Sequence, residues 1–331
     1  MRHANIALFV PNIGCKNTCS FCDQRAITGK VNPPAPQDVR AAADRALETM
    51  GEAARGAEIA FFGGSFTAID PEYRTSLLKA AYFYVEKGLF RGIRISTRPD
   101  AVDAEILSEL KAYGVTAVEL GAQSMRDEVL SANLRGHTAG QVRRAAEMIK
   151  STGFSLGLQM MTGLYLDDDA GAVYTAEEIT KLSPDSVRIY PTVLFKGTYL
   201  EMLFRKGIYR PQTLEEAVRL CAGLLLRFHE KDIPVIRLGL HTIDRESYLD
   251  GPFHPAFREL CEGSIYFDRA VSLLTRRNIP KGEVLLAVRR GEISKMIGQR
   301  RINIEKLSRR GYNCKISEDV SIKKYEICLL P

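Results

Sequence analysis

Three cysteines near the start of the chain have a spacing that can support metal chemistry. Cys15, Cys19 and Cys22 follow an apolar segment in a C-x3-C-x2-C pattern. Three thiolates can bind three irons of a [4Fe–4S] cubane, which leaves the fourth iron open to a small molecule. Structural zinc prefers four closed ligands, and no Cys or His follows Cys22 within twenty residues. The pattern therefore predicts an iron–sulfur cluster; a zinc site closed by His3, or a loop without metal, are the alternatives.

The segments around this triad predict an α/β fold. Short β-branched runs alternate with helical patterns of ten or more residues, which is typical of βαβ units and a parallel sheet. The expected strands are residues 6–10, 59–62, 93–96, 117–120, 155–161, 187–190 and 235–238. The expected helices are residues 39–50, with Asp38 as N-cap, 73–87, 104–113, 141–151, 170–182 and 214–229. Six or seven such units favour a partial (β/α)6 barrel of the TIM type, whose chemistry lies at the C-terminal ends of its strands.

Charge divides the chain unevenly. Residues 276–331 hold 14 Lys/Arg against 6 Asp/Glu, whereas the preceding part is close to neutral. We therefore expect a core over residues 1–272 and a small basic α+β domain over residues 276–331. A basic domain on a near-neutral body favours a polyanionic partner, with a solvated tail as the alternative.

The sequence also predicts where the protein works. No apolar run reaches the ~18 residues of a membrane span, and the apolar segment at residues 6–10 is too short for a signal peptide. Clustered cysteines in a reducing compartment indicate metal binding rather than disulfides. We expect a cytoplasmic protein without membrane contact.

The cysteine pattern, with Phe21 before its third cysteine, resembles the signature of the radical S-adenosylmethionine (SAM) superfamily. The resemblance implies that Cys15, Cys19 and Cys22 hold the cluster and that SAM binds its open iron. It also implies that one electron, from a donor such as a flavodoxin or ferredoxin, cleaves SAM to a 5′-deoxyadenosyl radical. The residues that act on the substrate stay unassigned.

Further segments resemble the SAM-binding motifs of this superfamily in the same order. Residues 61–66 resemble the glycine motif, in which the main chain of Gly63 and Gly64 would hold the SAM amino group. Gln123, after the fourth expected strand, would contact the ribose or carboxylate of SAM. Arg135 would pair with the SAM carboxylate.

Two more positions complete the expected SAM site, although they depart from the motif. Ser96 stands where many relatives have Glu, and Gln159 stands where relatives often carry a ribose-binding Asp. We include both as SAM contacts.

Several motifs together resemble the elongator catalytic subunit over residues 4–270. They are residues 11–15, 96–100, 119–124, 188–193, 196–198 and 251–256. Relatives in this branch modify the wobble uridine of tRNA with SAM and acetyl-CoA, and they carry an acetyltransferase domain after the barrel. We expect no such domain here, so the acetyl-dependent step is not carried over.

Residues 293–307 resemble a KH RNA-binding module, with two short helices joined by a Gly-x-x-Gly-like loop. The loop starts at Gly298, and Arg301 replaces its last glycine. The resemblance implies that Lys295, Arg300 and Arg301 contact RNA phosphates. The sequence thus predicts a radical SAM enzyme acting on RNA, with tRNA as the expected partner. A radical SAM enzyme for a small molecule and an RNA-binding protein with a structural cluster remain the alternatives.

Overall fold

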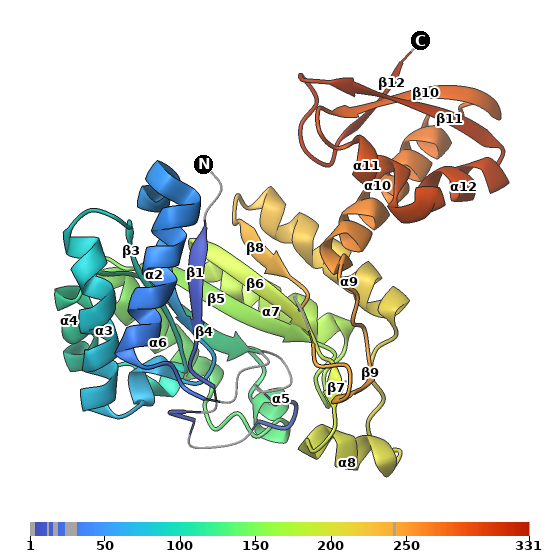
Figure 1. Cartoon of the computed structure of the whole chain (residues 1–331). Helices are drawn as coiled ribbons and strands as arrows, with labels where there is room; N and C mark the ends of the chain where they lie inside the picture. Colours follow the sequence, from blue (N-terminus) through green and yellow to red (C-terminus); the bar gives the residue numbers. More distant parts are fainter. Residues whose placement is uncertain (1–3, 12, 16–18, 24–31, 241–242, 331) are drawn as a thin grey trace.

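The computed structural model describes residues 4–11, 13–15, 19–23, 32–240 and 243–330. Its largest element is a seven-stranded sheet in which neighbouring strands are parallel (Figure 1). Across the sheet the strands keep their chain order: β1 (Asn5–Phe9), β2 (Glu58–Phe62), β3 (Gly92–Thr97), β4 (Val115–Gln123), β5 (Ser155–Thr162), β6 (Ser186–Pro191) and β8 (Val235–Leu238). Because each crossover leads to the adjacent strand, the sheet curls into an open half-barrel.

Helices connect successive strands and cover the outer face of the sheet. They are α2 (Pro36–Met50), α3 (Pro71–Glu86), α4 (Ala104–Ala112), α6 (Ala139–Ser151), α7 (Asp169–Lys181) and α9 (Leu214–Glu230). Shorter elements lie toward the C-terminal ends of the strands: α5 (Asp127–Ala132), α8 (Tyr199–Arg205) and the pair β7 (Leu194–Phe195) and β9 (Tyr248–Asp250). Within the described residues, no helix combines the length and the apolar composition needed to span a bilayer.

The predicted α/β class and half-barrel are confirmed, and apolar burial explains them. Side chains on the outer face of the strands, such as Ile59, Ile93 and Leu158, are fully buried against the helices. The apolar positions alternate along these strands, as at Ile93 and Ile95, which is why periodicity located them.

The expected N-cap of the first helix is wrong. Ala35 is the N-cap, and Asp38 lies at the third helical position, where its carboxylate accepts a hydrogen bond from the Ala35 N–H at 2.7 Å. Pro36 starts the helix earlier than expected, because proline lacks the N–H that the first turn leaves unpaired.

A long helix that the sequence analysis did not predict, α10 (Phe257–Arg276), links the barrel to the C-terminal residues. It begins beside the end of β8, where a Cβ on Gly239 would come within 2.9 Å of Phe257. It packs along α9, and residues 282–330, the basic unit, pack against it from Glu262 onward (Figure 1). Its 20 residues span about 30 Å.

The basic unit is a small α+β layer built on α10. Its sheet has the order β11-β10-β12 and its helices are short: β10 (Gly282–Arg289), α11 (Ile293–Ile297), α12 (Ile302–Arg309), β11 (Tyr312–Asp319) and β12 (Ile327–Leu330). Buried polar contacts join it to α10; the Tyr325 hydroxyl donates to Glu262 at 2.9 Å and the Asn303 amide donates to the Gly263 carbonyl at 2.8 Å. The KH resemblance and the division after residue 272, which falls within α10, stay predictions.

Candidate functional site

The cysteine loop, residues 13–23, follows β1 at the C-terminal edge of the sheet; residues 16–18, and His3 of the zinc alternative, lie outside the described residues. Cys19 is buried, and Cys15 and Cys22 are partly buried. Ser20 anchors the loop, because its N–H and its hydroxyl both donate to Asn133, at 3.1 and 2.7 Å. The end of α5 thus holds the loop in place.

Neighbouring thiols and burial affect the ionisation of Cys15 and Cys22. Burial, together with Cys19 and Cys15, raises the pKa of Cys22 to about 12. Burial and Cys19 also raise the pKa of Cys15, against the opposing charges of Arg98 and Arg135. Crowded, buried thiols need positive charge to ionise, and a bound metal centre supplies it.

The donor set fits a cubane cluster. Among the described residues, no three His, Cys, Asp or Glu side chains are grouped as ligands of one metal ion. A cubane does not require that grouping, because each thiolate binds a different iron. The other cysteines lie on different elements: Cys221 on α9, Cys261 on α10, Cys314 on β11 and Cys328 on β12.

Arg135 connects the cysteine loop to the sheet. Its guanidinium donates to the Cys19 sulfur at 3.0 Å and to the Gly121 carbonyl at 2.6 Å. Gly121 lies at an irregularity near the end of β4, where the pairing with β5 shifts and Gln123 takes a positive φ of 67°. The structure therefore brings two of the predicted SAM residues, Gln123 and Arg135, to the cysteines.

The glycine turn after β2 interlocks with the cysteine loop. Gly63 and Gly64 have φ values of 81° and 37°, which L side chains rarely adopt. A Cβ on Gly64 would lie 2.3 Å from the Ile13 carbonyl oxygen, and a Cβ on Gly14 would lie 2.3 Å from that of Ser65. The two loops approach each other so closely that neither Gly14 nor Gly64 can be replaced without moving the backbone.

We expect Gly64→Ala to disrupt the site and not merely to strain one turn. Gly88→Ala is a matched control, because Gly88 also has a positive φ, 68°, but a Cβ added there would meet no atom within 4 Å. The control should lose about 1–2 kcal/mol of stability from its backbone conformation alone. Gly64→Ala should lose more stability than the control, which urea unfolding measures. It should also lose iron uptake, which the iron content of the reconstituted protein measures. Equal losses in the two variants would contradict the interlock.

Unpartnered buried polar atoms gather beside the cysteines. In the described part of the chain, eight buried side-chain nitrogen or oxygen atoms have no hydrogen-bond partner. Four of them lie together here: Arg98 Nη1, Gln123 Oε1, Arg135 Nε and His137 Nδ1. Buried polar atoms in native proteins normally have partners, so this group indicates a missing ligand. Two donors and two acceptors suit a ligand such as SAM, which carries a carboxylate and also ammonium and hydroxyl groups.

Arg98 and His137 are site residues that the sequence analysis did not assign. The Arg98 guanidinium donates to Asp100 at 2.8 Å and to the Arg135 carbonyl. His137 Nε2 lies 3.3 Å from the Ala122 carbonyl and therefore carries the proton. Burial and Arg135 lower the pKa of His137 to about 4, so it is neutral at pH 7. Their positions in the sequence could have indicated a role in the site, because Arg98 directly follows β3 and His137 lies just before α6.

Ser96 and Gln159 lie together, but inside the half-barrel. The Gln159 amide donates to Ser96 Oγ at 3.3 Å and to the Glu119 carboxylate at 2.9 Å. Glu119 is 1% exposed and also accepts from Arg188, at 2.6 and 2.8 Å, and from Arg94, at 3.2 Å. The two predicted SAM contacts thus belong to a buried network below the strand ends, and their role toward SAM stays a prediction.

The three predicted RNA contacts are not equivalent. Arg300 and Arg301 are exposed on the turn between α11 and α12, with φ values of 52° and 64°. Lys295 is instead held by carboxylates, since its Nζ lies 2.8 Å from Glu292 and 3.2 Å from Glu262. These ion pairs neutralise Lys295 and tie α11 to α10, whereas Arg300 and Arg301 stay exposed; the role of all three toward RNA stays a prediction.

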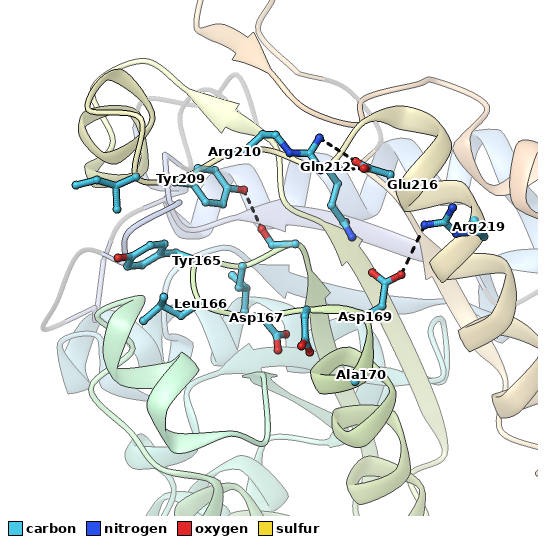
Figure 2. A pocket seen from close by; sticks show the side chains of 14 residues that line it. Tyr165, Leu166, Asp167, Asp169, Ala170, Tyr209, Arg210, Gln212, Glu216 and Arg219 are labelled. Atoms are coloured by element: carbon cyan, nitrogen blue, oxygen red, sulfur yellow. Dashed lines mark hydrogen bonds and ion pairs between the residues drawn. The ribbon is translucent and has the colours of Figure 1, made fainter.

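A pocket of about 570 Å³ opens beyond the end of β5, between the loops that lead into α7 and α9 (Figure 2). Tyr209 crosses it and donates its hydroxyl to the Gly163 carbonyl at 2.8 Å. Tyr209 also belongs to the apolar cluster that packs against Phe21 of the cysteine loop. Ion pairs across the pocket join Arg210 to Glu216 and Arg219 to Asp169. The pocket therefore adjoins the site, and these pairs balance much of its charge.

Curated relatives resemble part of this chain. Human Elongator complex protein 3 is 30% identical over 202 residues, which covers 54% of this chain and 36% of that protein. The tRNA uridine(34) acetyltransferase of Methanocaldococcus jannaschii is 29% identical over 194 residues, covering 53% and 36%. That of Dehalococcoides mccartyi is 25% identical over 239 residues, covering 62% and 52%. The chain thus spans between about a third and a half of the length of these relatives.

A solved structure supports the fold. The N-terminally truncated archaeal Elp3 of Methanocaldococcus infernus matches with a TM-score of 0.62 at 20% identity, covering 84% of this chain and 64% of that one. At this identity the match shows the shared fold.

Family-wide sequence patterns assign the family. The pattern of the Radical SAM superfamily matches residues 9–178, just over half of the chain, and includes the cysteine loop and the glycine turn. The pattern of the Radical_SAM C-terminal domain matches residues 184–266. The chain therefore belongs to the radical SAM superfamily, whose enzymes use a [4Fe–4S] cluster and SAM.

Proposed function

We propose that this chain is a radical SAM enzyme that modifies RNA, with tRNA as its substrate. The observation that carries the chemistry is the group of unpartnered donors and acceptors beside three cysteine thiols. Curated relatives named as tRNA uridine(34) acetyltransferases support the substrate class.

Each residue of the site has a defined task in this proposal. Cys15, Cys19 and Cys22 would hold the cluster, and Arg135 would donate to the Cys19 sulfur while fixing the end of β4. When bound, the cluster supplies the electron that cleaves SAM. Main-chain groups of the glycine turn, Gln123 and Arg98 would orient SAM with hydrogen bonds. The apolar cluster around Phe21 would keep water from the reactive centre.

The place of the basic unit favours a large, folded RNA over a short one. α10 begins beside the end of β8, and the unit packs against α10 from Glu262 onward. In Figure 1 the unit lies at the opposite end of the sheet from α5, which anchors the cysteine loop. An RNA bound by Arg300 and Arg301 must therefore extend along the molecule to present a nucleotide to the site.

We expect the reconstituted protein, given SAM, a reductant and tRNA, to form a modified nucleoside together with 5′-deoxyadenosine. The double variant Arg300→Gln/Arg301→Gln should bind tRNA more weakly, and its slope of log K against log salt should fall by about 1–2. Arg55→Gln is the control, because Arg55 is exposed and pairs only with Glu52 among the described residues. Nucleoside mass spectrometry and filter binding provide the measurements.

The same assay distinguishes the proposed function from the two alternatives, a small-molecule substrate and a structural cluster. Release of 5′-deoxyadenosine that tRNA never stimulates, with unchanged RNA nucleosides, would favour a small-molecule substrate. A cluster that never supports SAM cleavage, in a protein that binds RNA, would favour a structural cluster.

A further inference from the structure

One arginine inside the half-barrel has no counter-ion among the described residues. Arg237 on β8 is the register partner of Arg188 on β6. Arg188 is in turn the register partner of Gln159 on β5, and Gln159 is the register partner of Gly121 on β4. The Gly121 carbonyl accepts a hydrogen bond from Arg135. This row of the sheet therefore runs from the Arg135–Cys19 contact to Arg237 at the open edge strand.

The charges around Arg237 are unbalanced. Glu119 neutralises Arg188, and Glu262 lies 3.3 Å from Arg258, the next cation in the neighbourhood. Arg237 itself donates from Nε to the Gly239 carbonyl at 2.9 Å, and no described carboxylate lies within ion-pair distance of its guanidinium. Burial, together with the charges of Arg188 and Arg258, lowers the pKa of Arg237, while Tyr190 opposes this effect.

A partly buried cation without a counter-ion costs folding free energy, and such costs are concentrated at functional sites. The Nε contact leaves both Nη groups without a described partner, and two parallel N–H donors match the oxygens of a phosphate or carboxylate. Tyr190, on the same strand as Arg188, hydrogen-bonds Arg188 in the same part of the half-barrel.

We propose that Arg237 forms an oxyanion-binding position on the substrate side of the site. Its ligand is a phosphate or carboxylate group carried by the substrate or by a second reactant. The RNA form of this inference, in which the anion is a nucleotide phosphate, rests on the proposed function. In either form Arg237 positions the substrate inside the half-barrel.

Thermal unfolding of the full-length protein tests this position. The probes are sodium phosphate, sodium acetate and uridine 5′-monophosphate, added at constant ionic strength. We expect at least one probe to raise the Tm saturably, and Arg237→Gln to weaken the apparent affinity about tenfold. Without probe, Arg237→Gln should keep or raise the Tm, because it removes an unpaired charge; a purely structural arginine would lower it. Arg227→Gln, an exposed residue on α9 paired with Glu177, is the control.

The outcomes are distinct. Absence of a saturable response to every probe in the wild type, or an equal response in Arg237→Gln, would overturn the oxyanion position. If Arg237→Gln also raises the KM for tRNA, the bound group is an RNA phosphate. If the probes bind through Arg237 while the wild type leaves tRNA unmodified, the proposed function fails and the oxyanion position stands.

Discussion

Replacing Cys19 with alanine is expected to reduce 5′-deoxyadenosine formation from SAM to the background of iron-free protein. The variant loses one of three thiolates, so the cluster loses a third of its protein ligands. It also loses the sulfur that Arg135 contacts at 3.0 Å, which joins the cysteine loop to the end of β4. The effect is measured after anaerobic reconstitution. Iron and sulfide content and electron paramagnetic resonance report the cluster, and chromatography reports 5′-deoxyadenosine.

Cys328→Ser is the matched control for this experiment. Cys328 is an exposed cysteine on β12, far along the chain from the cysteine loop. The Cys328→Ser variant should retain the cluster and cleave SAM as the wild type does. Iron content and turnover preserved in the Cys19 variant, or tetrahedral zinc as the metal of anaerobically purified wild type, would refute the cluster assignment.

Glu119→Gln is expected to be the most destabilising of these substitutions. The variant leaves Arg188 and Arg94 in the half-barrel without the carboxylate that both contact. Breaking a buried ion pair from one side costs about 3–5 kcal/mol, which urea unfolding would detect. Arg188 also lies over the ring of Phe62, 4.8 Å from its centroid, so its displacement should disturb the adjacent glycine turn.

The loss should depend on pH. Burial alone would raise the pKa of Glu119, but Arg188 and Arg94 hold it below its usual value. A carboxylate with a depressed folded-state pKa stabilises the protein above its unfolded pKa, and this contribution disappears as the pH falls through the folded value. The wild-type advantage should therefore be full at neutral pH and shrink in acid.

Glu216→Gln provides the comparison, since Glu216 pairs with Arg210 near the surface. We expect no measurable change, because exposed ion pairs contribute little to stability. Similar losses from both substitutions would mean that the Glu119 network is no more important than a surface pair.

Local spacing in the sequence located the parts of the site that depend on one segment. The cysteine pattern and the glycine turn are short, and their chemistry follows from residue types at fixed offsets. The strands were found because the residues facing the helices are apolar at alternate positions, as at Ile93 and Ile95 or at Leu156, Leu158 and Met160. The structure of each of these segments is determined by residues that are close together in the sequence.

The remainder depends on contacts between distant segments. Glu119, Arg94 and Arg188 come from three strands, and only the sheet register shows that they neutralise one another. Ser96 and Gln159 matched SAM-binding positions in the sequence, yet their described hydrogen bonds join this network. The helix α10 was missed because Ala256, its N-cap, makes no side-chain cap and Gly263 interrupts its pattern.

The contacts of α10 fix the basic unit to the barrel. The helix packs against α9, and the basic unit packs against it from Glu262 onward, within two turns of its start. Each residue added to or removed from such a helix shifts what it carries by about 1.5 Å and turns it by about 100°. The number of residues between Phe257 and Glu262 thus sets where the basic unit lies relative to the barrel.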